Sequence, residues 1–383
     1  MSTPPAGGAE PHLFTPFSVR SVTFRNRVIV SPMCQYAARD GLANDWHRDH
    51  HARFALGGIG GALVESTGVR ADGRITPACL GLYNDSQAAA LRPIVDLYHR
   101  AGVPVGIQLS HSGRKGSAAT PADGAAPLAA GAPSLAWETC APSAIAMTEG
   151  WPTPHALGAD EIEGLVAAFA AAARRALAAG FDFIEIHGAH GYLIHSFMSP
   201  LSNRRNDAWG GDLAGRMRFP LAVARAVRAV MPASAPLFYR ASAVDAVEGG
   251  LEIADTIALA RALKAAGVDL IDCSAGGITG ASGRAHQAPT PGYLVPYAEE
   301  IRGQAAIPVM AVGLIVDPHQ AEAIIAEGRA DLVALGRQLL ADPNFAFHAA
   351  EALGVADPFS VLPASYAFFL KRRPKLAPPV GRA

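Results

Sequence analysis

Residues 171–192 read AAARRALAAGFDFIEIHGAHGY. The first part belongs to an Ala/Leu/Arg segment, residues 160–179, whose apolar positions have helical spacing. Gly180 stands where a helix that leads into a strand often carries glycine. Residues 181–187 are a short run of nearly continuous hydrophobicity that ends in His187. Such a run predicts a parallel strand that is buried on both faces.

The same helix and strand pattern repeats along the chain. Further β-branched apolar runs predict strands at residues 28–33, 61–67, 103–109, 236–242, 268–274, 307–313 and 330–336. Helical spacing recurs at residues 213–230, 251–266 and 318–328, and glycine again marks the end of two of these helices, at Gly267 and Gly328. Strand and helix alternating eight times predict a single α/β domain, a (β/α)8 TIM barrel.

An open, doubly wound sheet is the alternative architecture. No G-x-G-x-x-G motif follows the first predicted strand, and eight units is the number that closes a barrel. Two connections are long, residues 110–158 after the third strand and 275–292 after the sixth. Long loops in a compact domain are usually functional, so we expect both to border the active face of the barrel.

The composition excludes several classes of protein. There are 32 Lys and Arg against 33 Asp and Glu among 383 residues, so no net charge draws the chain to nucleic acid. Half of the residues are hydrophobic and 17% are charged, which excludes a disordered chain. The four cysteines form no C-x-x-C pair, which argues against zinc and iron–sulfur sites and fits a reducing cytoplasm. No apolar run is long enough to predict a membrane span.

The expected barrel occupies residues 12–355 and leaves two tails. Residues 1–11 have no basic segment and no apolar segment, so they predict a flexible tail rather than a signal peptide. Residues 356–383 contain three consecutive basic residues, Lys371 to Arg373, and several prolines. We therefore expect them to form a C-terminal tail outside the core.

Polar residues and glycines stand at the ends of the predicted strands, where TIM barrels carry their chemistry. These residues are Cys34, Glu65, Gln108, His187, Arg240, Ser274, Gly313, Gly336 and Arg337. Inward polar side chains such as Gln108 and Arg240 are costly to bury without a partner. A bound polar ligand would satisfy them, so the set indicates a ligand site at this rim.

The most informative motif is His187-x-x-His190-x-Tyr192, which follows the fourth strand. One interpretation is structural, with His187 at a strand end and His190 on the surface. A second is a metal site, for which Glu185 shares the strand face but lies about 6–7 Å deeper and Arg240 repels a cation. We favour a third, in which two imidazole N–H groups polarise a carbonyl or nitro oxygen and Tyr192 supplies a proton.

Other strand-end residues give weaker signals. Gly313, Gly336 and Arg337 follow the seventh and eighth strands, where barrels often bind phosphate. Cys34 either fills a core gap or acts as a nucleophile, and Glu65 is either a paired structural acid or part of the site. Every lysine lies outside the predicted strands, which argues against Schiff-base chemistry.

Several separate motifs together resemble the old yellow enzyme family of FMN-dependent ene-reductases, over about residues 12 to 355. They are S-P-M-C-Q-Y from Ser31, G-I-Q-L-S-H-S-G-R-K from Gly106, A-P-S-A-I-A from Ala141, I-E-I-H-G-A-H-G-Y-L-I-H-S-F-M-S-P-L-S-N-R-R-N-D from Ile184, A-V-G-L-I from Ala311 and D-L-V-A-L-G-R from Asp331. Cys34 after S-P-M, where other branches carry threonine, and Tyr36 two residues later resemble the thermophilic-like, xenobiotic-reductase branch. Residues 212–216 depart from the family's S-x-E-N-R, and Trp209 replaces a usual tyrosine.

The resemblance implies how FMN would bind. The residues that would contact the cofactor are Ser31, Pro32, Met33 and Ser66. Those that would hold its phosphate are Gly313, Gly336 and Arg337. Cys34 would lie over the flavin and tune its potential. Gln108 would hydrogen-bond the pyrimidine end of the ring, and Arg240 would stabilise negative charge on the reduced flavin.

The resemblance also implies the reaction, which is the reduction by NADPH or NADH of alkenes activated by a carbonyl, imide or nitro group. Tyr36 would line the substrate pocket, and His187 and His190 would bind the substrate oxygen. Tyr192 would protonate Cα while flavin N5 gives a hydride to Cβ. No metal takes part in this scheme.

The resemblance implies a cytoplasmic enzyme that forms a homodimer or homotetramer. In the branch that it resembles, a residue of the C-terminal tail enters the neighbouring subunit's site. The candidates for that residue are Tyr366, Arg372 and Arg373. Two other classes of function are alternatives. One is a metal-dependent hydrolase that uses His187 and His190. The other is a protein that binds flavin without turnover, against which Tyr192 argues because binding needs no proton donor.

Overall fold

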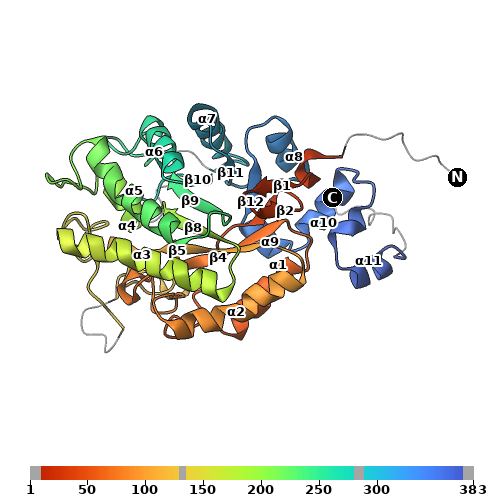
Figure 1. Ribbon diagram of the computed structural model, residues 1–383, viewed down its shortest axis with the longest axis horizontal. Coiled ribbons are helices and arrows are strands. Elements are labelled where there is room, and N and C mark those ends of the chain that lie inside the picture. The colour runs from red at the N-terminus through yellow and green to blue at the C-terminus, as the bar shows by residue number, and fades with distance from the viewer. Residues whose placement is uncertain (1–9, 129–134, 280–288, 374–383) are drawn as a thin grey trace.

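The computed structural model describes residues 10–128, 135–279 and 289–373 (Figure 1). Parallel strands form a closed barrel in the order β10-β11-β12-β3-β4-β5-β8-β9. Their bounds are β3 Val28–Val30, β4 Gly61–Gly68, β5 Val105–Ser110, β8 Phe183–Gly188, β9 Leu237–Ser242, β10 Leu270–Ser274, β11 Val309–Ala311 and β12 Leu332–Leu335. The predicted eight strands and the (β/α)8 TIM barrel are confirmed.

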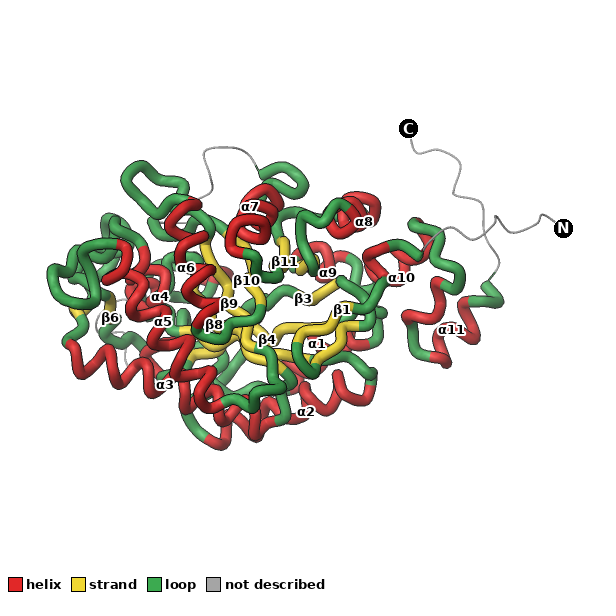
Figure 2. Tube along the Cα trace, turned by 45° about the horizontal axis from the view of Figure 1, so that its top comes forward, coloured by secondary structure: helices red, strands yellow, loops and turns green. Residues whose placement is uncertain are grey.

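Helices surround the barrel on its outside (Figures 1 and 2). They are α1 Asp45–Ala55, α2 Asp85–Arg100, α3 Ala159–Ala179, α5 Leu213–Val230, α6 Ile253–Ala265, α7 Val295–Ala305, α8 Pro318–Ala326 and α10 Phe345–Ala352. The four predicted helices end within two residues of their expected bounds. Gly180, Gly267 and Gly328 have φ of 99°, 92° and 70°, the left-handed conformation that ends a helix.

The interior of the barrel is layered because alternate residues of each strand point inward. Near the amino-terminal end the inward side chains are apolar, and they include Phe183, Phe238 and Leu270. A hairpin, β1 (Phe17–Val19) and β2 (Val22–Phe24), adds Phe24, whose ring packs edge-on against Phe183 at 5.6 Å. Two residues further along the same strands stand Glu185, Arg240 and Asp272. The polar groups therefore begin above an apolar plug, toward the carboxyl ends of the strands.

The described parts of the long connections contain short elements. The connection from 110 to 158 carries the 3-10 turns η3 (Gly113–Lys115) and η4 (Pro121–Asp123), and the paired strands β6 (Cys140–Ala141) and β7 (His155–Ala156). Residues 129–134 of this connection and 280–288 of the other lie outside the described residues. A further short helix, α4 (Leu193–Met198), directly follows the histidine motif.

The chain after α10 continues into η5 (Pro358–Val361) and α11 (Ala364–Leu370), which lie to one side of the barrel (Figure 1). Val361 and Leu362, which fall inside the predicted tail, are buried in the main core, and a Cβ on Gly58 would come within 2.8 Å of Val361. Packing therefore continues beyond residue 355. In the described ranges, the helices are too short or too polar to cross a membrane.

Candidate active site

His187, His190 and Tyr192 come together at the carboxyl end of β8. The ring of His187 lies 5.1 Å from that of His190 and 4.9 Å from that of Tyr192, both edge-on. The chain turns tightly between them, with φ of 61° at His190 and 74° at Gly191. A Cβ on Gly191 would lie 2.1 Å from the carbonyl oxygen of Gly277, so only glycine fits there. The predicted convergence of this motif is confirmed.

Both histidines are neutral in this environment. Burial, and then the positive charge of Arg240, hold the pKa of His187 and of His190 well below the usual value. The Nδ1 atom of His187 accepts a hydrogen bond from the Ala189 amide at 3.2 Å, so its proton is on Nε2. His190 Nε2 lies 2.7 Å from Ser274 Oγ. Ser274 therefore engages Nε2 of that ring and not Nδ1.

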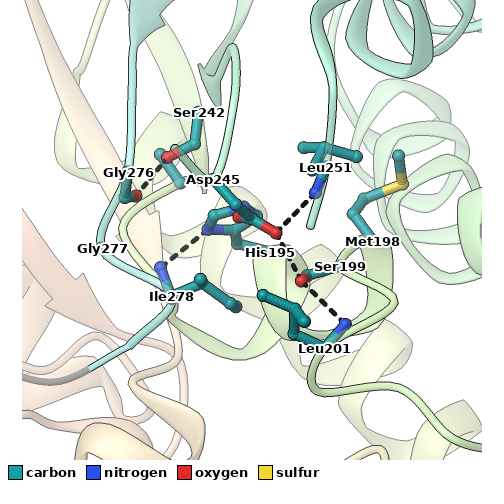
Figure 3. Close-up of polar contacts among 12 residues, drawn as sticks. His195, Met198, Ser199, Leu201, Ser242, Asp245, Leu251, Gly276, Gly277 and Ile278 are labelled. Carbon is teal, nitrogen blue, oxygen red and sulfur yellow. Dashed lines mark hydrogen bonds and ion pairs between the residues drawn. The ribbon is translucent and has the colours of Figure 1, made fainter. Parts of the chain in front are cut away.

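A buried network behind the motif fixes the turn, and sequence reasoning missed it (Figure 3). The Gly191 amide donates to His195 Nδ1 at 2.8 Å, and His195 Nε2 lies 2.9 Å from Asp245 Oδ1. The other carboxylate oxygen of Asp245 accepts from Ser199 Oγ at 2.6 Å and from the Leu251 amide at 2.7 Å. His195 was visible inside the quoted motif, but its partner lies 50 residues away, and only the fold brings the two together.

Lys115 is a second residue that the sequence analysis set aside. Its Nζ donates to the carbonyl oxygens of His190 at 2.9 Å and Gly277 at 3.0 Å, and it lies 5.4 Å from the centre of the Tyr192 ring. Burial, and then Arg114, lower the pKa of Lys115 to about 8. A Schiff-base lysine is expected at a strand end, whereas Lys115 reaches the site from η3.

A cavity of about 360 Å³ lies at the same rim, between the ends of β3, β11 and β12. Five predicted cofactor residues line it, namely Ser31, Arg240, Gly313, Gly336 and Arg337. Ser274 lines it too and connects it to His190. Gly313 has a φ of 113°, and Gly336 directly precedes α9 (Arg337–Ala341), so two of the residues that line this end carry no side chain.

Two of the expected flavin-ring residues occupy a polar layer of the barrel. Arg240 Nε is 3.3 Å from Asp272 Oδ2, and its Nη1 donates to Ser31 Oγ at 3.3 Å. Gln108 Nε2 donates to Glu185 Oε1 at 2.8 Å. Glu185 is therefore hydrogen-bonded to Gln108 below the rim. This position argues against Glu185 as the third ligand of a metal site that would include His187 and His190. Among the described residues, no group of three His, Cys, Asp or Glu is placed to hold a metal ion.

The segment after β3 carries Cys34 and Tyr36. Burial, and then the charge of Glu65, raise the pKa of Cys34 well above the usual value, so the side chain is a thiol rather than a thiolate. The Tyr36 hydroxyl and the Ser66 backbone amide are its hydrogen-bonding neighbours. Pro32 and Met33 are half-buried, and a Cβ on Gly336 would lie 3.5 Å from the Met33 sulfur.

Glu65 is a paired structural acid. Its Oε1 lies 3.1 Å from His47 Nε2, both side chains are buried, and its Oε2 accepts from the Gln35 amide. This outcome was one of the two alternatives for Glu65. The pair anchors the strand-end segment that contains Cys34 and Tyr36 to α1, which carries His47.

The residues at this rim fit FMN. An anionic phosphate is suited by the main chain at Gly313 and Gly336 together with the Arg337 guanidinium. A flat ring that carries hydrogen-bond donors and acceptors is suited by Gln108 and Arg240. The cavity volume falls in the range of ordinary ligand sites.

Comparisons with known proteins agree with this geometry. The model of the NADH:flavin oxidoreductase / NADH oxidase family matches residues 12–355. NADPH dehydrogenase from Geobacillus sp. (strain WCH70) is 44% identical over 354 residues, which are 92% of this chain and 97% of that protein. NADPH dehydrogenase from Listeria innocua is 44% identical over 345 residues, covering 89% and 95%.

Solved structures give the same picture. Morphinone reductase superposes with a TM-score of 0.73 at 27% identity, covering 88% of each chain. The old yellow enzyme homologue from Zymomonas mobilis superposes with a TM-score of 0.72 at 28% identity, covering 88% of this chain and 91% of that one. Another structure of morphinone reductase holds tetrahydroNAD.

Barrel, rim and relatives together define a flavin oxidoreductase that takes its electrons from a nicotinamide. The chain belongs to the NADH:flavin oxidoreductase / NADH oxidase family, the family of old yellow enzyme. It is an NAD(P)H-dependent enzyme of the NADPH dehydrogenase type, and its cofactor is FMN. The resemblance, the enzyme class and the cofactors predicted from the sequence are confirmed.

Proposed function

We propose that this enzyme is an ene-reductase that uses NADPH or NADH to reduce the C=C bond of small alkenes activated by a carbonyl, imide or nitro group. The observation that carries the proposal is the contact of two neutral imidazoles and one tyrosine at the rim, beside the cavity that suits FMN. Bound FMN supplies the hydride that such a reduction requires.

His187 and His190 bind the oxygen of the activating group in this proposal. A neutral imidazole donates from one nitrogen, and for His187 that atom is Nε2 because Nδ1 accepts the Ala189 amide. Negative charge grows on the substrate oxygen when a hydride reaches Cβ. Hydrogen bonds to that oxygen strengthen at the same moment, so they stabilise the transition state more than the ground state.

Tyr192 gives the proton to Cα. Burial raises the pKa of its phenol well above the usual value, so the proton is in place at neutral pH. The Lys115 ammonium, 5.4 Å from the ring centre, places a positive charge beside the phenolate that proton transfer leaves behind. Tyr36 borders the substrate on the side of Cys34.

Ser31, Pro32, Met33, Cys34 and Ser66 contact FMN in the proposed complex. The phosphate is held by Gly313, Gly336 and Arg337. The ring is oriented by Gln108 and Arg240. The metal-dependent hydrolase, the alternative from the sequence, gains no support, since Glu185 is hydrogen-bonded to Gln108.

The test is a product analysis in deuterium oxide with 2-cyclohexenone, NADPH and the FMN-loaded enzyme. We expect cyclohexanone with deuterium at Cα, the position that receives the solvent-derived proton. Formation of the allylic alcohol, or recovery of unchanged enone while NADPH is oxidised, would refute the assignment.

We also propose a homodimer or homotetramer. On α11 the side chains of Tyr366, Phe368 and Phe369 are 47%, 52% and 71% exposed, an unusual cost for aromatic residues on a monomer surface. The Arg372 guanidinium stacks on Phe368, with 3.6 Å between Cζ and the ring centre. Sedimentation equilibrium tests the proposal, and a monomer at micromolar concentration would exclude it.

A further inference from the structure

Four polar side chains cross the barrel in one layer beneath the rim. Gln108 points inward from β5, Glu185 from β8, Arg240 from β9 and Asp272 from β10. Glu185 and Asp272 are both 0% exposed, Gln108 is 2% exposed and Arg240 is 8% exposed. The residues below them on these strands form the apolar plug, so solvent does not reach the two carboxyl groups from beneath.

This layer contains two acidic side chains, Glu185 and Asp272, and only one positively charged side chain, Arg240. Arg240 lies beside Asp272, with 3.3 Å between Nε and Oδ2. The carboxyl group of Glu185 is within hydrogen-bonding reach of Asp272 and also accepts from Gln108. His187, the next inward residue on β8, is neutral, and β11 presents Met310 beside Asp272. Two adjacent buried carboxylates do not both ionise against a single guanidinium.

The hydrogen bonds in this layer also show more acceptor oxygens than donors. Written as carboxylates, Glu185 Oε2 and Asp272 Oδ1 have no donor among the described residues, and Asp272 Oδ2 has only the ion-pair contact with Arg240 Nε at 3.3 Å, which is not a hydrogen bond. A proton on Glu185 Oε2 gives Asp272 the missing donor and leaves Glu185 Oε1 free to accept from Gln108. The pKa directions agree. Burial, and then the charge of Asp272, raise the pKa of Glu185 well above its usual value, while Arg240 opposes the rise at Asp272 that burial causes.

We propose that Glu185 keeps its proton at neutral pH, hydrogen-bonded to the Asp272 carboxylate, and that both acids are positioning residues that aim Gln108 and Arg240 at the FMN ring. Glu185 takes the amide nitrogen of Gln108, so the carbonyl oxygen of that side chain is the atom left for a donor on the ring. Arg240 Nε lies beside Asp272, and Nη1 donates to Ser31. The third nitrogen, Nη2, is therefore left to donate to an acceptor on the flavin ring. The inference rests on FMN as cofactor and is independent of the alkene substrate.

The first test is infrared spectroscopy of the protein at pH 7, with and without FMN. A protonated carboxyl group has a carbonyl stretch that a carboxylate lacks. We expect such a band, and we expect it to shift when glutamate is labelled with carbon-13 but not when aspartate is labelled. Absence of the band, or a shift with labelled aspartate alone, would overturn the proposal, and neither labelling requires a variant.

Variants then locate the proton. Glu185→Gln should abolish the band, whereas Glu65→Gln, which changes the buried acid paired with His47, should retain it. The midpoint potential of bound FMN reports the positioning role. Asp272→Asn removes the carboxylate beside Arg240 and should shift the potential to more positive values. Glu185→Gln replaces one neutral group by another and should shift it less. Equal shifts in the two variants would contradict the assigned proton.

Discussion

Tyr192 stands beside two neutral imidazoles, and its phenol proton has a single proposed use. We predict that Tyr192→Phe slows enone reduction about 100-fold, the usual contribution of a positioned general acid. Reduction of the flavin by NADPH should not change, because no proton from Tyr192 is needed there. Stopped-flow absorbance measures the two half-reactions separately.

The matched control for this variant is Tyr239→Phe. Tyr239 is also buried, and its hydroxyl has no hydrogen-bond partner among the described residues, so its removal should leave both half-reactions unchanged. Enone turnover that is undiminished in Tyr192→Phe would remove Tyr192 from the reaction.

Cys34 is a neutral thiol in the segment that should cover the flavin. We predict that Cys34→Ala retains stoichiometric FMN and shifts its midpoint potential, since the side chain tunes the flavin rather than anchoring it. Cys79→Ala is the control, because Cys79 is buried against Thr76 and should leave the potential unchanged. Loss of FMN from a folded Cys34→Ala protein would refute the tuning role.

The turn from β8 into α4 is the element that sets the spacing of the catalytic groups. We predict that Gly191→Ala destabilises the protein and abolishes most enone turnover, because a Cβ would lie 2.1 Å from the Gly277 carbonyl oxygen. The left-handed φ alone costs about 1–2 kcal/mol. Denaturant unfolding measures the change in free energy.

Gly211→Ala separates the two costs. Gly211 has a φ of 77°, close to the 74° of Gly191, but a Cβ there would meet nothing within 4 Å. Gly211→Ala should lose only the stability that the left-handed conformation costs, and it should keep its enone turnover. If the two variants lost equal stability and equal turnover, the close approach of Gly277 would not matter.

The elements that could be predicted from the sequence are those whose signal is local. Residues 181–187 are nearly continuous in hydrophobicity because β8 is buried on both faces, and Gly180 marks the preceding helix end by its conformation. The hairpin β1–β2 was missed because its two strands, F-S-V and V-T-F, are short and have a polar residue at the centre, whereas the equally short β3 and β11 stand inside longer apolar runs. The paired strands β6 and β7, of two residues each, are shorter still and were also missed.

The same distinction applies to the site. The rim residues could be predicted because the barrel fixes where strand ends meet. The contacts of Lys115, and the pairing of His195 with Asp245, depend on loops of unrelated sequence meeting in space. No spacing rule links residues 185 and 272 either, although both are acids inside strands. Partners of this kind become visible only when the barrel is closed.

At the scale of the whole molecule, a buried histidine makes stability depend on pH. His51 is 3% exposed, and burial, and then His50, hold its pKa well below the usual 6.5. Below pH 6.5 the unfolded chain binds a proton at His51 that the native state does not, so the free energy of unfolding falls as the pH falls. This loss is about 1.4 kcal/mol per pH unit.

We predict that His51→Gln is less stable than the wild type at pH 8, because the contact of His51 Nδ1 with the Tyr98 hydroxyl at 2.8 Å is lost. The difference should narrow between pH 6.5 and 5, because the variant lacks the histidine that resists protonation. Denaturant unfolding across this range measures it, with the exposed His319→Gln as control. Parallel curves for His51→Gln and wild type would contradict the prediction.

The most direct test of the proposed reaction is the visible absorption spectrum of the FMN-loaded enzyme under anaerobic conditions. We predict that NADPH bleaches the flavin bands and that 2-cyclohexenone, added next, restores them with formation of cyclohexanone. Flavin bands that bleach with NADPH but do not return with the enone, nor with an activated imide or nitroalkene, would contradict the ene-reductase proposal.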